Sequence, residues 1–238
     1  MIRLGVLVPG ANTTVEPEMY KMVPQGVTIH FERLFISRQI SSPLEVLEQL
    51  AQDTPRAARA FVGIEPKLKV IAFACNSGSF YKGIEFDNEL VQIIEAAAGV
   101  PSISTSGGEI QALKELGLNK LCMISPYTDC QHEWGREFLV ANGFEVVASK
   151  GLGVPIMEHN ELLPEFAREL AIATCRGVNC DGVYSCCTAF RTIEILEEVE
   201  RELGKPMVSA NQATMWLMLK KAGVKGPISG FGTLLRNL

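Results

Sequence analysis

The chain has 238 residues, of which 47% are hydrophobic and 21% are charged, and its formal net charge is -5. This length supports one large domain or two small ones with a substantial core. The acidic balance and the lack of a Lys/Arg cluster argue against a nucleic-acid partner. The longest apolar runs, such as 70–75, are far too short to span a membrane, so we expect no membrane partner.

Seven cysteines occur in the chain, an odd number. The apolar run of the opening MIRLGVLVPG is too short for a secretory signal, and NTTVE follows where a cleavage site should be. We therefore expect reduced thiols in a cytoplasmic protein. The spacing of Cys175, Cys180 and Cys186 is not that of a zinc site, and no metal is predicted. Four cysteines are interpreted as inert small apolar residues: Cys122, Cys130, Cys175 and Cys180.

Strand-like and helix-like segments alternate along the chain. The predicted strands are 3–8, 27–34, 69–74, 102–103, 120–124, 145–149, 182–185 and 207–209. The predicted helices are 43–61, 88–98, 107–116, 128–142, 161–174, 192–203 and 212–222. Such alternation is typical of parallel sheets flanked by helices, so the predicted fold class is α/β.

The second half of the chain repeats landmarks of the first half. Pro9 and Pro126 lie 117 residues apart, each between a strand and a polar turn that leads into a helix. The runs ending in ACNSGS and SCCTAF place cysteines 112 residues apart if Cys187 matches Cys75, and two later prolines lie 105 residues apart. Three landmarks in one order predict a duplicated α/β unit, and hence two similar lobes.

Polar or nucleophilic residues follow four predicted strands, namely Asn12, Cys75, Tyr127 and Cys187. Ligands of open α/β sheets bind beyond the carboxyl ends of the strands. If the lobes face each other about a pseudo-twofold axis, these four strand ends meet in one cleft. Asn12 could in addition cap a helix that begins near residue 15.

A pair of opposed thiols suits three reactions of small carboxylates. These are two-base racemisation, cis–trans isomerisation by thiolate addition and elimination, and decarboxylation, which needs only one thiol. All three develop negative charge on a carboxylate-derived enediolate and need preorganised donors. We expect those donors in the turns after the strands, where backbone N–H groups can also lower the pKa of a thiol below ~8.5.

Six motifs together carry a specific resemblance: VPGANTTVEPEM, ACNSGS, SPYT, HNELLP, SCCTAFRT and ANQATMW. The chain resembles the aspartate/glutamate racemase superfamily, in its branch of maleate cis–trans isomerases and arylmalonate decarboxylases. The resemblance implies two pseudo-symmetric Rossmann-like lobes, each a parallel sheet flanked by helices, with the active site in the cleft between them. We assign 1–104 plus 209–238 to the N-terminal lobe and 105–208 to the C-terminal lobe.

The resemblance also implies roles for individual residues. Its Cys-Thr-x-x-Arg-Thr motif selects Cys187 over Cys186, with Cys75 as the nucleophile and Cys187 as the acid or base. The decarboxylases that resemble this chain have no cysteine at the first site, so Cys75 argues against decarboxylation. The substrate-binding residues predicted in this way or from the turns are Asn12, Asn76, Ser77, Tyr127, Asn160, Thr188 and Ala189.

The sequence thus predicts a cofactor-independent cis–trans isomerase of maleate or a related small unsaturated dicarboxylate. The alternatives are a two-cysteine racemase or epimerase of an amino acid or hydroxy acid, an arylmalonate-type decarboxylase, and a non-catalytic carboxylate-binding protein. No nucleotide loop is present. We expect a homodimer or higher homo-oligomer, as is common among relatives. His159 is interpreted as a turn or surface histidine without a catalytic role, and Arg191 points either to a carboxylate or to solvent.

Overall fold

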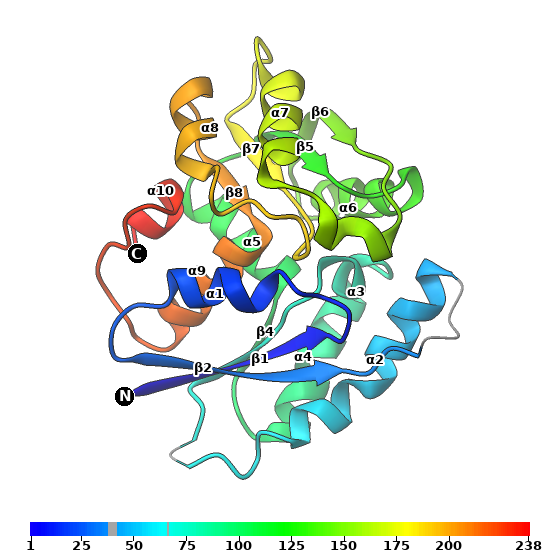
Figure 1. Cartoon of the computed structure of the whole chain (residues 1–238), viewed down its shortest axis with the longest axis vertical. Helices are drawn as coiled ribbons and strands as arrows, with labels where there is room; N and C mark the ends of the chain where they lie inside the picture. Colours follow the sequence, from blue (N-terminus) through cyan, green and yellow to red (C-terminus); the bar gives the residue numbers. More distant parts are fainter. Residues whose placement is uncertain (38–41, 66) are drawn as a thin grey trace.

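The computed structural model describes residues 1–37, 42–65 and 67–238 and contains two four-stranded parallel sheets (Figure 1). The first sheet has the order β2-β1-β3-β4, with β1 Ile2–Pro9, β2 Val27–Leu34, β3 Val70–Phe73 and β4 Ser102–Ser104. The second has the order β6-β5-β7-β8, with β5 Lys120–Ser125, β6 Glu145–Gly151, β7 Gly182–Ser185 and β8 Met207–Ser209. The two sheets share one strand order, as expected of a duplicated unit.

Helices connect the strands and cover both sheets. Their bounds are α1 Val15–Met22, α2 Pro43–Arg59, α3 Asn76–Phe80, α4 Ile84–Ala98, α5 Thr105–Glu115, α6 Asp129–Ala141, the 3-10 helix η1 Ile156–Glu161, α7 Pro164–Cys175, α8 Leu196–Leu203, α9 Ala210–Lys221 and α10 Gly232–Arg236. All eight predicted strands and all seven predicted helices are present. The helices α4 and α5 begin before their predicted first residues. The helices α7 and α8 begin after theirs.

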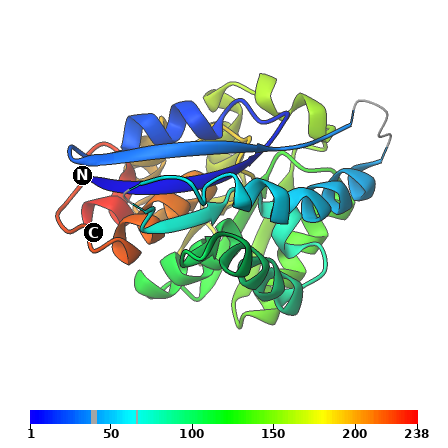
Figure 2. The same cartoon turned by 90° about the horizontal axis from the view of Figure 1, so that it is seen from below.

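The first sheet lies between two layers of helices (Figure 2). On one face, Leu7 and Phe73 of the strands share a core with Leu50 of α2 and Ile94 of α4. On the other face, Val6 and its neighbours pack in a larger core that continues into the second half of the chain. Alternate residues of each strand therefore point into different cores, as the two-residue period of a strand requires.

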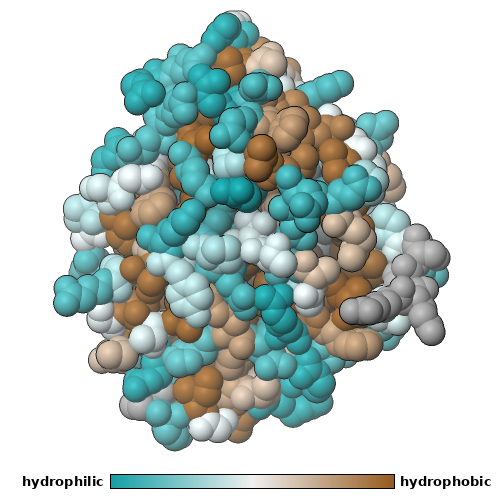
Figure 3. Space-filling model, in the orientation of Figure 1, coloured by the Kyte–Doolittle hydropathy of each residue, from teal (hydrophilic) through white to brown (hydrophobic). Residues whose placement is uncertain are grey.

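The outer surface is mixed in character. The face shown in Figure 3 carries polar side chains over most of its area, with small apolar patches between them. The exposed large apolar side chains include Tyr20, Phe35, Met157, Leu163 and Phe166. Within the described ranges, no helix is long and apolar enough to cross a lipid bilayer.

The two halves of the chain meet where α5 crosses α9, the helices that follow β4 and β8 (Figure 1). The Thr105 and Thr214 hydroxyls are hydrogen-bonded to each other at 2.9 Å. At Gly108 an added Cβ would lie 3.4 Å from the carbonyl oxygen of Ala213. Because α9 contacts α1 and β3 as well as β8, the lobe division assigned from the sequence stays a prediction.

The close approach of α5 and α9 gives a stability prediction. We expect Gly108→Leu to lower the free energy of unfolding by about 1–3 kcal/mol, because its side chain would overpack the helix crossing. Gly108→Ala is the matched control: its Cβ makes only an ordinary contact, and the loss of glycine in a helix adds up to about 1 kcal/mol of stability. Urea unfolding of both variants is the measurement, and equal stability of Gly108→Leu and the wild type would refute a tight crossing.

Candidate active site

One cavity lies beyond the carboxyl ends of both sheets. Its volume is about 60 Å³. It brings together the four residues that follow β1, β3, β5 and β7: Asn12, Cys75, Tyr127 and Cys187. All nine residues singled out from the sequence line it, since Asn76, Ser77, Asn160, Thr188 and Ala189 do so as well.

Cys75 stands at the N-terminus of α3, directly after β3. Burial raises the pKa of its thiol to about 11, although the Gly78 N–H and the Ser77 hydroxyl act in the opposite direction. The expectation of a lowered pKa is therefore wrong for Cys75. Desolvation outweighs donors from a helix of only five residues. Gly78 is required beside this thiol, because an added Cβ would lie 2.9 Å from Cys75 Sγ.

Cys187 occupies the equivalent turn after β7. Its φ of 97° makes it the one non-glycine residue with a positive φ among the described residues. Such a conformation is strained for a side chain of this kind and persists only where the surroundings impose it. Burial raises the pKa of this thiol to about 12, against the Ala189 N–H and the Tyr127 hydroxyl. Both cysteines of the cavity are therefore neutral thiols at neutral pH.

Asn76 links the two cysteine turns. Its Oδ1 accepts a hydrogen bond from the backbone N–H of Cys187 at 2.9 Å. Its Nδ2 donates to the carboxyl group of Glu109, which also accepts from the Tyr184 hydroxyl at 2.9 Å. Glu109 is 1% exposed, and burial raises its pKa well above the usual value. The buried carboxyl group of Glu109 thus fixes the Asn76 amide.

Cys186 points away from the cavity. It is fully buried, and its Sγ lies 3.8 Å from the carbonyl oxygen of Ile124 in the second sheet. The geometry therefore places the thiol of Cys187, and not that of Cys186, at the site.

Asn12 organises the turn between β1 and α1. Its Oδ1 accepts from the N–H groups of Thr14 at 2.8 Å and Val15 at 3.0 Å. Its Nδ2 donates to the Thr188 hydroxyl at 3.1 Å, which reaches across to the second half of the chain. Asn12 thus caps α1 and lines the cavity at the same time.

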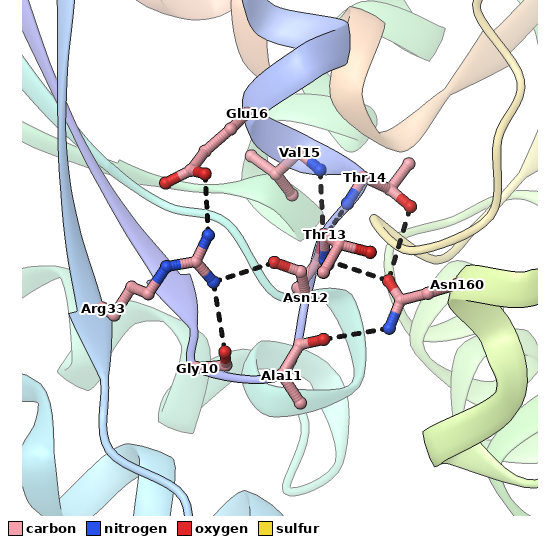
Figure 4. Close-up of polar contacts among 9 residues, drawn as sticks. All are labelled: Gly10, Ala11, Asn12, Thr13, Thr14, Val15, Glu16, Arg33 and Asn160. Carbon is pink, nitrogen blue, oxygen red and sulfur yellow. Dashed lines mark hydrogen bonds and ion pairs between the residues drawn. The ribbon is translucent and has the colours of Figure 1, made fainter.

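Two side chains hold this turn from opposite sides (Figure 4). Asn160 of η1 donates to the Ala11 carbonyl at 2.9 Å and accepts from the Thr13 N–H at 3.1 Å. Arg33 of β2 donates to the carbonyls of Gly10 at 3.1 Å and Asn12 at 3.0 Å, and it pairs with Glu16 at 2.7 Å. Both polar atoms of the Asn160 side chain are therefore engaged with the turn.

His159 is a residue that the sequence interpretation missed. It is 1% exposed and lines the cavity, so its interpretation as a surface residue is wrong. Its Nδ1 lies 3.7 Å from Cys187 Sγ. The residue lies in a short 3-10 helix with no periodic pattern, and its burial arises from contacts distant in sequence.

An apolar wall completes the cavity opposite the polar turns. It is formed by Ile36, Val46, Leu47, Leu50, Ile156 and Met157. None of the described residues that line the cavity is a lysine or arginine. Arg191 is not among the lining residues and pairs with Glu194 at 3.0 Å.

Comparison with known proteins agrees with this geometry. Residues 4–235 match the family model described as arylmalonate decarboxylase. The maleate isomerase of Geobacillus stearothermophilus is 26% identical over 98% of this chain and 96% of its own length. The arylmalonate decarboxylase of Bordetella bronchiseptica is 26% identical over 65% of each chain.

Solved structures share the fold. The maleate isomerase Iso from Pseudomonas putida S16 superposes with a TM-score of 0.90 at 22% identity, over 99% of this chain and 98% of that one. A Nocardia farcinica maleate cis–trans isomerase variant with a covalently bound succinylcysteine intermediate gives 0.84 at 23% identity, with the same coverage. The predicted two-sheet α/β fold is confirmed. On the match over 4–235, the chain belongs to the arylmalonate decarboxylase family.

Proposed function

We propose that this protein is a cofactor-independent cis–trans isomerase of maleate or a related small unsaturated dicarboxylate. The observation that carries the proposal is the meeting of Cys75 and Cys187, from equivalent strand ends, in one small cavity. Maleate isomerases that match this chain over nearly its whole length support the same activity. A relative that carries a succinylcysteine supports a covalent route.

In the proposed reaction Cys75 sulfur forms a bond to one olefinic carbon, and a proton is added at the other. The net change is addition of the Cys75 S–H across the double bond: Cys187 delivers a proton to carbon and regains the proton that Cys75 releases. The remaining single bond rotates. Cys187 then takes a proton from that carbon, the carbon–sulfur bond breaks, one proton returns to the Cys75 sulfur, and the trans diacid leaves with both thiols restored.

The carboxylates are held by the polar side of the cavity. Asn12, Asn160 and Tyr127 line this side: each amide nitrogen has one N–H beyond the bond that holds the turn, Tyr127 has its hydroxyl, and Ser77, Thr188 and Ala189 border the cavity beside the two cysteines. Asn76 contributes by fixing the position of Cys187. Hydrogen-bond donors aimed at the enediolate stabilise the charge that develops during addition.

Racemisation by the same two thiols is the main rival, because either sulfur could exchange a proton with an α-carbon between them. Decarboxylation needs one thiol and leaves Cys75 without a task. We further propose that the protein acts in the cytoplasm as a homodimer or higher homo-oligomer. All seven cysteines are free, which suits a reducing compartment.

Removal of the second thiol should trap the covalent intermediate. We expect Cys187→Ser to lower turnover of maleate by about 10²–10⁴-fold, the usual contribution of a positioned acid or base. An adduct at Cys75 should then appear in intact-protein and peptide mass spectra. Cys186→Ser is the matched control and should retain turnover. The assignment of the pair fails if these two variants behave in the reverse way.

The substrate class can be tested in one experiment. Proton NMR in deuterium oxide should show maleate or citraconate converted to its trans isomer. Racemisation would instead appear as α-hydrogen exchange of aspartate or glutamate, and decarboxylation as carbon dioxide loss from an arylmalonate. Exchange or carbon dioxide loss without isomerisation of either diacid would overturn the proposed function in favour of the corresponding rival.

The raised thiol pKa values predict slow alkylation of the empty enzyme. In a Cys130→Ser background, which removes the exposed cysteine, iodoacetamide should modify Cys75 slowly at pH 7.5. The rate should climb about tenfold per pH unit toward pH 11, because only the thiolate reacts. Peptide mass spectrometry gives the rate. A plateau already reached near pH 8 would show that the donors at α3 outweigh desolvation.

A further inference from the structure

The ring of His159 is fixed in one orientation by its two nitrogens. Nε2 lies 2.9 Å from the carbonyl oxygen of Val154, which can only accept, so Nε2 carries the hydrogen. Burial lowers the pKa of this imidazole, so the ring is neutral at neutral pH. Nδ1 therefore presents a lone pair, and it lies 3.7 Å from Cys187 Sγ. This distance suits an S–H donor and a nitrogen acceptor.

The contact is specific to this histidine. His132 is part-buried as well, but its Nδ1 lies 2.7 Å from the Ser125 hydroxyl and it does not line the cavity. His30 lies on β2 beside Thr28. Among the described residues, His159 is thus the histidine in contact with a thiol of the active site, and its ring also lies 5.5 Å from that of Tyr127.

The proposed reaction leaves a gap that this contact fills. Cys187 must take a proton from carbon in the elimination step, yet in the empty cavity it is a neutral thiol. A neutral thiol is a poor base, and it needs an acceptor for its own hydrogen as it receives another. The Nδ1 lone pair is the acceptor within reach.

We propose that His159 is a catalytic residue that accepts and returns the proton of Cys187. This inference rests on the isomerase function proposed above. As Cys187 sulfur takes a proton from the substrate carbon, its original S–H proton moves to Nδ1, and the carbon–sulfur bond to Cys75 breaks. Cys187 is a thiol before and after the step, Cys75 leaves with the electron pair of the broken bond, and the imidazole then returns one proton through Cys187 to the Cys75 sulfur, so that both thiols and the neutral imidazole are restored. In the addition step the same transfers run in reverse: the Cys75 proton passes through Cys187 to Nδ1, and Nδ1 returns a proton through Cys187 as the substrate carbon is protonated.

Glutamine at position 159 separates this role from a structural one. Its side-chain amide can keep the hydrogen bond to the Val154 carbonyl, but it has no basic nitrogen for Cys187. We expect His159→Gln to lower kcat by about 10²-fold or more, with KM changed by less than about threefold and thermal stability retained. Glu158→Gln, at the exposed neighbouring position, is the matched control and should leave both constants unchanged.

A second measurement does not depend on activity. Nitrogen-15 NMR of the imidazole should show a protonated Nε2 and an unprotonated Nδ1, and the Nδ1 resonance should shift in Cys187→Ala. Full turnover of His159→Gln, or a hydrogen on Nδ1, would overturn the inference. If the wild type isomerises no diacid while NMR shows the expected tautomer and shift, the proposed function has failed and the thiol–imidazole contact stands.

Discussion

The hydrogen bond from the Cys187 backbone to the Asn76 side chain is the constraint on which the site depends. Asn76 directly follows Cys75 in the chain, and its side chain holds the turn that carries Cys187. One residue therefore links the backbone positions of the two thiols. The φ of 97° at Cys187 persists because its N–H is held in this way. Glu109 in turn fixes the amide and itself accepts from the Tyr184 hydroxyl, so the bridge is anchored in the buried interior.

The duplicated fold repeats this bridge in the opposite direction. Thr188, which follows Cys187 as Asn76 follows Cys75, donates its hydroxyl hydrogen to the carbonyl of Ala74 at 3.2 Å. Its own carbonyl accepts from Asn211 at 2.9 Å, and Asn211 also donates to the buried carboxyl of Glu18. Each half therefore holds the cysteine turn of the other half. Relative motion of the two sheets would disturb both thiols together, which makes the geometry of the pair a property of the whole chain.

Features that a local sequence pattern determines could be predicted from the sequence. Features that depend on contacts between distant parts of the chain could not. The strands were predictable because apolar runs end at polar or glycine residues, and Cys75 was found because it stands at such an end. The choice of Cys187 over Cys186 came from the family resemblance and not from the pattern. The five-residue helices α3 and α10 are too short to show a period. The position of His159 and the direction of the thiol pKa shifts depend on how deeply the folded chain buries these groups, which no spacing reveals.

The cavity has an apolar wall, and none of the described residues that line it is a lysine or arginine. These surroundings limit which charged intermediates can form there. An isolated thiolate in such surroundings would be costly, as the raised pKa values of both cysteines show. Addition of S–H across a double bond creates no net charge, provided that each proton moves as its bond forms. A proton that moves between Cys187 and His159 meets this condition. The two atoms lie 3.7 Å apart, so the negative charge that develops on the substrate has its counter-charge close by. The burial that disfavours thiolates at this site therefore favours a mechanism in which protons pass only between Cys75, Cys187, His159 and the substrate.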